Sequence, residues 1–296
     1  MLRAATRGSE LALAQTRSVG RQLGEPVEEV VVSTLGDRRA DVPIWEMGGR
    51  GVFVKEVQAA VLDGRADLAV HSAKDLPSSP PAGLVLAAVL EREDPRDALV
   101  GAALGELPTG ARVATGSVRR RAQLASLRPD LSFAGLRGNI RTRLAKAAGF
   151  DAVVVAAAAL ARLGLSHLAA EVLDPSVLLP QVGQGAIAVE AREGDDAVLG
   201  ALAALEHRPT RRAVDAERAY LRRLGGGCDL PVAAHATVGP GGSVSLTAML
   251  ATLDGHIVLS ASGSGDDPEA LGAALAARLL DESGGAWLLE SLRGLA

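Results

Sequence analysis

The sequence predicts an α/β protein with two similar, doubly wound lobes and a small C-terminal α+β domain. Short apolar segments alternate with amphipathic helical segments, as in βαβ units around a largely parallel sheet. The same order of segments recurs further along the chain, and the last part carries three alternating segments typical of an antiparallel sheet. With 296 residues, 48% of them hydrophobic, the chain is long enough to bury separate cores for these parts.

The first predicted lobe begins with a short strand at 2–6, after which Gly8 and Ser9 open a helix that runs to about Leu23. A second strand over 27–35 ends in Gly36 and Asp37, and a helix follows over 54–62. Residues 67–71 are expected to form a buried strand. The segment LPSSPPAG at 76–83 is a turn-rich loop.

The second predicted lobe repeats these segments in the same order. RAATRGS at 3–9 returns as RVATGS at 112–117, the helix at 54–62 has a counterpart at 140–148, and GRADLAV at 64–70 is echoed by GFDAVVV at 149–155. Two such lobes would face each other across a cleft lined by strand-to-helix turns. Helix N-termini at those turns present free N–H groups and favour anions.

The rest of the chain is expected to close the first lobe and then build the C-terminal domain. Residues 178–191 form a loop that enters a strand and returns the chain to the first lobe. A helix at 210–224 leads to a glycine run and Cys228, and strands follow at 232–238, 244–252 and 257–263. The last helix is expected at 268–280.

The charge distribution favours a small anionic ligand over nucleic acid. The formal net charge is −4, yet residues 119–146 hold eight basic residues against Asp130 alone. Phe133 is the only aromatic residue in that stretch, so it cannot form a base-stacking platform. Arginine, which makes up 28 of the 31 basic residues, can grip carboxylates with two hydrogen bonds. Taken alone, such a charge run is usually a solvated face.

Several classes of protein are excluded or disfavoured by missing signals. No apolar run approaches the roughly 20 residues of a membrane-spanning helix, and the N-terminus does not resemble a secretory signal, so a cytoplasmic location is expected. A single cysteine excludes an intrachain disulfide and a cysteine-based zinc site. Gly183-Gln184-Gly185 is too weak a signal for a nucleotide loop, and no metal-ligand array is present.

Three positions allow both a chemical and a structural interpretation. Cys228 could be a small buried residue, a nucleophile or a tether, and no histidine lies near it in sequence. Asp75 follows a buried strand, where ligands of parallel sheets bind, but could equally cap a turn. Lys74 beside it could pair with a carboxylate or contact an anion, and His71 is expected to point into the core.

A set of motifs resembles the porphobilinogen deaminase family, also called hydroxymethylbilane synthases, over nearly the whole chain and in family order. These motifs are RAATRGSELALAQ at 3–15, GVFVKE at 51–56, ADLAVHSAKDLP at 66–77, the arginine pair at 119–120, LRGN at 136–139, LGL at 163–165, LPQVGQG at 179–185, ERA at 217–219 and RLGGGC at 223–228. The combination is highly specific.

The resemblance implies a fold, a reaction and a cofactor. Residues 1–91 with 186–205 and residues 96–182 would form two lobes like those of type II periplasmic binding proteins, and residues 209–296 a third domain. The family joins four porphobilinogen units head to tail, with loss of ammonia, into hydroxymethylbilane. The chain grows on a dipyrromethane primer that the resemblance attaches to Cys228 as a thioether. No metal, nucleic acid or membrane partner is implied, and a monomer suffices.

The resemblance also assigns site residues by motif position. Asp75 matches the catalytic aspartate of the family. The side chains expected to hold the cofactor are Ser72, Lys74, Thr115, Ser117, Arg119 and Arg120. Those expected to bind substrate are Arg7, Ser9, Gln15, Arg137, Arg143 and Arg162. The sequence departs from the family pattern at Arg50, where many members have lysine, and at 233–235, where a glycine-containing stretch is common.

Two other functions remain open from the residues alone. A two-lobed protein with an arginine-lined cleft could be a non-catalytic binding protein for small carboxylate or phosphate anions. A thiol-dependent enzyme of another class could use Cys228 as a nucleophile, with His71 or His235 as its base. The first alternative has no need of the cysteine, and the second requires a histidine near it in space.

Overall fold

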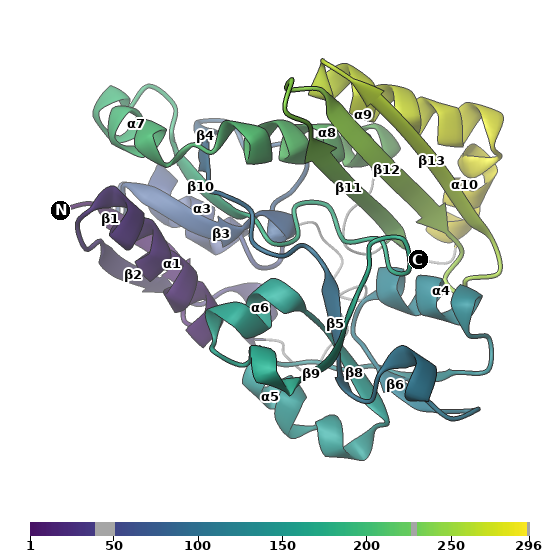
Figure 1. The fold of residues 1–296 in the computed structure, drawn as a ribbon. Coiled ribbons are helices and arrows are strands. Elements are labelled where there is room, and N and C mark those ends of the chain that lie inside the picture. Colours follow the sequence, from purple (N-terminus) through teal and green to yellow (C-terminus); the bar gives the residue numbers. More distant parts are fainter. Residues whose placement is uncertain (39–50, 226–229, 295–296) are drawn as a thin grey trace.

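The computed structural model describes residues 1–38, 51–225 and 230–294 (Figure 1). These residues form two five-stranded mixed sheets and one three-stranded antiparallel sheet, so the predicted fold class is confirmed. Within them, no helix combines the length and the apolar character needed to cross a lipid bilayer. The same residues contain no cluster of metal-ligating side chains.

The first sheet has the strand order β2-β1-β3-β10-β4 and is covered on both faces. Along β3, Leu68 and Val70 pack on one side, where α1 and α7 lie, and Ala69 packs on the other, against α3. The strands are β1 (Arg3–Arg7), β2 (Glu28–Val32), β3 (Leu68–Ser72), β4 (Leu84–Val89) and β10 (Ile187–Arg192). The helices are α1 (Glu10–Leu23), α3 (Lys55–Leu62) and α7 (Asp196–Leu202).

The second sheet repeats this topology with the order β7-β6-β8-β5-β9. The central strand β8 is buried along its whole length, and hydrophobic clusters lie on both of its faces. The strands are β5 (Asp97–Gly101), β6 (Arg112–Ala114), β7 (Ser132–Ala134), β8 (Ala152–Ala156) and β9 (Ala169–Leu173). The helices are α4 (Val118–Leu127), α5 (Ile140–Ala145) and α6 (Ala157–Arg162).

The sheets are largely parallel, as expected, but one strand in each lobe runs against the others. β10 pairs antiparallel with β3 and β4, and β5 pairs antiparallel with β8 and β9. Both strands arrive from the opposite lobe rather than through a crossover helix of their own lobe, so the handed βαβ connection does not fix their direction. The predicted return of the chain to the first lobe is confirmed by β10.

The C-terminal part packs a long helix against its sheet. α8 (Arg208–Leu224) lies between the first sheet and the strands β11 (Val232–Val238), β12 (Val244–Ala251) and β13 (Val258–Gly265) (Figure 1). The fully buried Tyr220 anchors this packing, because its hydroxyl donates to the carbonyl of Met249 at 2.9 Å. α9 (Pro268–Ala277) also packs on α8.

Three boundary predictions are wrong. The helix expected at 140–148 ends at Ala145, and a separate 3₁₀ turn follows at Ala147–Gly149. The strand expected over 27–35 ends at Val32, because Thr34 and Asp37 bond to each other and start a helical turn, α2 (Leu35–Arg38). The helix expected at 268–280 is not the last. α9 ends at Ala277, a five-residue π-turn follows, and α10 (Gly285–Gly294) begins after Gly284, whose φ of +80° reverses the chain.

Candidate active site

A cavity of about 930 Å³ lies between the lobes and reaches the C-terminal part. Three helices direct their N-terminal ends at it: Ser9 caps α1, Ser117 caps α4 and Asn139 caps α5, and all three cap residues line the cavity. The sequence folds this way locally because each cap side chain accepts a bond from a backbone N–H of the first helical turn. The predicted cleft of strand-to-helix turns is confirmed.

The described lining of this cavity is strongly cationic. Three acidic side chains belong to it, and Glu10 and Asp37 are each paired with an arginine. Asp75, at the end of the short turn after β3, makes no ion pair among the described residues. The eight basic side chains of the lining are Arg7, Lys74, Arg119, Arg120, Arg137, Arg141, Arg143 and Arg218.

Burial, together with neighbouring positive charges, lowers the pKa of two of these groups. Burial, followed by the charge of Arg120, lowers the pKa of Lys74 to about 8. Burial, followed by the charges of Arg120 and Arg137, lowers the pKa of Arg143 to about 10. The carboxylate of Asp75 opposes both changes. An anion bound in the cavity would therefore add negative charge beside Lys74 and Arg143 and would favour their protonated, positively charged forms.

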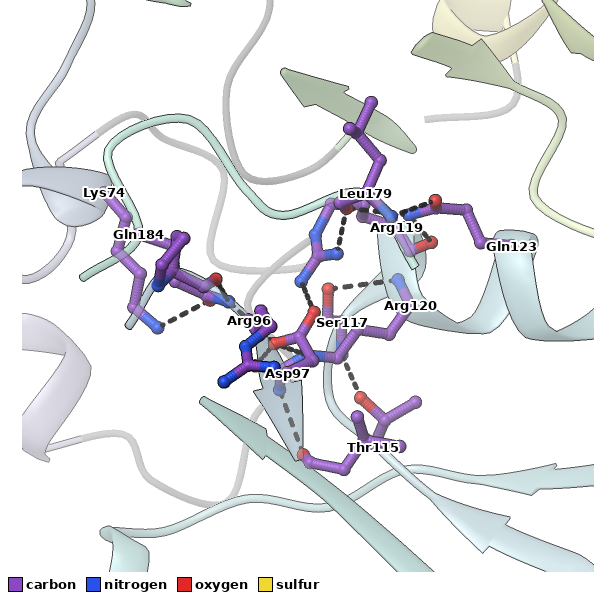
Figure 2. A network of polar contacts seen from close by, with 12 residues as sticks. Lys74, Arg96, Asp97, Thr115, Ser117, Arg119, Arg120, Gln123, Leu179 and Gln184 are labelled. Carbon is purple, nitrogen blue, oxygen red and sulfur yellow. Dashed lines mark hydrogen bonds and ion pairs between the residues drawn. The ribbon is translucent and has the colours of Figure 1, made fainter. Parts of the chain in front are cut away.

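Arg119 and Arg120 share one fully buried carboxylate, that of Asp97 (Figure 2). Both Nη2 atoms lie 2.7 Å from its oxygens. Burial alone would raise the pKa of Asp97, but the two guanidinium charges bring it well below its ordinary value. Gln184 adds a third donor at 2.8 Å and accepts from Lys74 Nζ at 3.3 Å, so the network extends to the residue beside Asp75.

The turn that carries Lys74 and Asp75 packs closely against the backbone of Gly183. A Cβ at Gly183 would lie 2.9 Å from the carbonyl carbon of Ala73, and its φ of +71° also favours glycine. The N–H of Gly183 donates to Glu217 Oε2 at 2.7 Å. Glu217, fully buried on α8, thus connects the C-terminal part to the turn that bears the candidate catalytic residue.

Smaller contacts order the first-lobe wall of the cavity. Gln15 Nε2 donates to Ser72 Oγ at 2.8 Å, which joins α1 to the end of β3. The guanidinium of Arg7 pairs with Asp37 and lies 4.3 Å from the centre of the Phe53 ring. These side chains therefore have fixed positions around the cavity.

Comparisons with known proteins agree over almost the whole chain. Residues 2–200 match the family model described as "Porphobilinogen deaminase, dipyromethane cofactor binding domain", and residues 212–281 match "Porphobilinogen deaminase, C-terminal domain". A porphobilinogen deaminase of Roseiflexus castenholzii is 50% identical over 294 residues, which cover 96% of this chain and 97% of that protein. One from Pelobacter propionicus is 47% identical over 300 residues, covering 98% and 96%.

The chain belongs to the porphobilinogen deaminase family. As a member of this family it is a transferase of tetrapyrrole biosynthesis, with dipyrromethane as its cofactor. Among solved structures, the periplasmic VFT2 domain of BvgS from Bordetella pertussis is similar over 69% of this chain and 85% of its own, at 18% identity and a TM-score of 0.37.

Most side chains that the porphobilinogen deaminase motifs single out meet at the cavity. The predicted residues that line it are Arg7, Ser9, Gln15, Ser72, Lys74, Asp75, Ser117, Arg119, Arg120, Arg137 and Arg143. Thr115 and Arg162 are not part of the lining. Thr115 Oγ1 accepts from the N–H of Ser117 at 3.2 Å, and Arg162 bonds Glu93 at 2.9 Å and the carbonyl of Gly185 at 2.7 Å.

The predicted attachment residue, Cys228, and the departing Arg50 lie outside the described residues. The other departure from the family pattern is described: Ala233 and Ala234 are fully buried in β11, and Ala233 packs with Ala122 of α4. His71 is 5% exposed beside Glu190, as expected for a core histidine. Arg121, the third member of the arginine run, is exposed.

Sequence reasoning missed three residues of the site. Asp97 and Gln184 hold the arginine pair, and Arg218 brings a cation from α8. Asp97 follows a charged segment and gives no motif signal. The signal for Gln184 was the glycine on either side of it, which marks a close approach of the backbone to Lys74 and Glu93 rather than a nucleotide loop.

Proposed function

We propose that the chain joins four porphobilinogen units head to tail, with loss of ammonia, into hydroxymethylbilane on a dipyrromethane primer tethered to Cys228. The observation that carries this proposal is the position of Asp75, an acidic group that makes no ion pair with the described residues, in a cavity lined by eight basic side chains. Each porphobilinogen carries an acetate and a propionate, so the growing chain gains two carboxylates per step. A cationic cavity with one available carboxylate suits both binding and catalysis.

The described side chains fit a polycarboxylate primer. The Nε atom of Arg119 is a buried donor without an acceptor in the described part of the chain, and burial together with neighbouring positive charges lowers the pKa values of Lys74 and Arg143. The residues proposed to hold the primer are Ser72, Lys74, Ser117, Arg119 and Arg120. When bound, the primer supplies the free α-carbon to which the next pyrrole is joined.

Substrate is proposed to bind beside the primer. Arg7, Arg137 and Arg143 would hold its carboxylates, and Ser9 and Gln15 would donate further hydrogen bonds. Thr115 and Arg162 act through their neighbours: Thr115 orients the N-terminal turn of α4, and Arg162 fixes the 183–185 segment. We therefore regard these two as positioning residues.

Asp75 is proposed to stabilise charge and to move a proton. When the bond between the aminomethyl carbon and nitrogen of porphobilinogen breaks, ammonia leaves with the electron pair and the pyrrole becomes cationic. The carboxylate of Asp75 stabilises that charge near the pyrrole nitrogen. It then accepts the proton that is released once the new carbon–carbon bond has formed. After four additions, water releases the product.

The division into domains is part of this proposal. Residues 1–91 with 186–205, residues 96–182 and residues 209–296 each contain one of the three sheets. The two lobes would adjust around each enlarged chain while the third part carries the tether. A monomer provides all of these parts.

The intact mass of the purified protein, compared with that of Cys228→Ala, tests the proposal. We expect the wild type to exceed its sequence mass by one dipyrromethane, and the variant to lack both this excess and turnover. A bare wild type that gains the mass with porphobilinogen is the unloaded enzyme. If neither protein gains mass or consumes porphobilinogen, the proposal is wrong and the alternative of a non-catalytic anion-binding protein is favoured.

A further inference from the structure

Arg218 differs from the other buried arginines of the cavity in having no hydrogen-bond or ion-pair partner among the described residues. It lies on α8, is 7% exposed and belongs to the cavity lining. Arg119 and Arg120, which are equally buried, each bond Asp97. Its guanidinium makes no hydrogen bond and no ion pair with another residue of the described part of the chain. The structure thus leaves a buried cation at the cavity wall.

The carboxylates around Arg218 are engaged elsewhere. Glu190 accepts from Gln58 Nε2 at 2.9 Å, and Asp215 pairs with Arg211 at 3.6 Å. Both act on Arg218 only over a longer range, and burial lowers its pKa. Arginine nevertheless keeps its proton in proteins, and an unpaired buried charge is costly. A ligand anion at this wall would provide the missing counter-charge.

The place of Arg218 indicates which anion this is. Leu221, Leu230 and Val232 line the same wall, which therefore offers apolar surface beside one cation. α8 ends at Leu224, six residues beyond Arg218 and about 9 Å along the helix. The chain is described again from Leu230, which lines the cavity itself and follows Cys228 by two positions in the sequence.

We propose that Arg218 binds a carboxylate of the tethered pyrrole chain at the C-terminal wall of the cavity. This proposal rests on the function proposed above. The other cations of the lining belong to the two lobes, so Arg218 alone would hold the chain from the part that bears its attachment point. It would act as a binding residue for the growing chain, with the apolar wall covering the pyrrole rings.

The test compares Arg218→Met with a matched variant, Arg211→Met. Arg211 lies two turns earlier on the same face of α8, but it bonds the carbonyl of Leu86 and pairs with Glu206 and Asp215, and it does not line the cavity. Each protein, as isolated, is given a short pulse of porphobilinogen. The lengths of the attached chains are then read by intact mass, kcat and KM are measured, and thermal unfolding is recorded.

Arg218→Met is expected to lower kcat/KM about tenfold, the effect of one charge-assisted bond, and to shift the attached chains toward shorter lengths. Its unfolding temperature should equal or exceed that of the wild type, because an unpaired buried charge has been removed. Arg211→Met should unfold at a lower temperature with unchanged chain lengths. Arg218→Lys, which keeps the charge, should recover part of the lost kcat/KM.

The proposal is overturned if Arg218→Met builds the same chains with the same kcat/KM as the wild type. It is also overturned if Arg211→Met gives the same shift, or if Arg218→Lys is no better than Arg218→Met. The wild-type arm separates this failure from that of the proposed function. A wild type that builds no chains refutes the proposed function, whereas a wild type and an Arg218→Met that build equal chains refute only the role of Arg218.

Discussion

Asp97→Asn removes the one charge that compensates two buried arginines. Asp97 is fully buried, and Arg119 and Arg120 are 3% and 6% exposed. Asn keeps one acceptor oxygen of the same shape, so the change is chiefly one of charge. The expected result is a large loss of stability in a protein whose cavity is otherwise unchanged.

The magnitude follows from what the substitution leaves behind. Removing one partner of a buried ion pair costs roughly 3–5 kcal/mol, because the other charge stays buried without compensation. At about 2 °C for each kcal/mol in a chain of this size, the unfolding temperature should fall by about 6–10 °C. Because the Asn oxygen still accepts hydrogen bonds, we expect the loss of stability to lie at the lower end of this range.

Urea and thermal unfolding of the wild type and Asp97→Asn measure this loss, with Asp130→Asn as the control. Asp130 pairs with Arg128 at the surface, and its replacement should leave the unfolding temperature within about 1 °C. Because the folded-state pKa of Asp97 lies well below its ordinary 3.8, its contribution is complete above that pH and is lost as the pH falls below it. A loss under about 1 kcal/mol at pH 7, or one that does not shrink in acid, would refute this reasoning.

Three further predictions concern the turn at the end of β3. Asp75→Asn should nearly abolish turnover while the primer mass is retained; unchanged turnover would exclude the catalytic role. Turnover of porphobilinogen should fall as the pH rises through about 8, by at most about tenfold per pH unit, because Lys74 loses the proton with which it holds a carboxylate of the tethered primer. Lys74→Arg should remove that fall, and its persistence would assign it to another group. Gly183→Ala should lower kcat because a Cβ would displace the turn, whereas Gly194→Ala, with a similar positive φ and nothing within 4 Å, should leave kcat unchanged; equal losses would contradict this account.

The local signals in the sequence were sufficient where one residue decides an element. The start of α1 was predicted from Ser9 because a cap side chain acts within a few positions of the chain. The sequence repeat predicted the second lobe because both lobes form a five-stranded sheet with the same order of strands. Asp75 was expected near a ligand site because it lies just beyond a buried strand, and it lines the cavity at the end of the short turn after β3.

The rest depended on contacts between distant parts of the chain. Asp97 lies 22 residues from Arg119, and Gln184 lies 87 residues from Asp97, so no local pattern joins them. The antiparallel direction of β5 and β10 depends on where the chain crosses between the lobes. A single sequence carries no local signal for that crossing, since it is fixed only when both sheets have formed.

The arginine-rich stretch at 119–146 shows how folding divides one charge run among different tasks. Arg119 and Arg120 both form ion pairs with Asp97, Arg121 is exposed, and Arg128 pairs with Asp130. The net charge of the stretch therefore overstates what is available to a ligand. What remains at the cavity comes from both lobes and from α8, and it surrounds the carboxylate of Asp75, which pairs with no arginine that the structure describes. Arginines that pair with carboxylates of the protein are less available to a ligand. The number of ligand carboxylates that such a site can hold therefore depends on the cations that face the cavity.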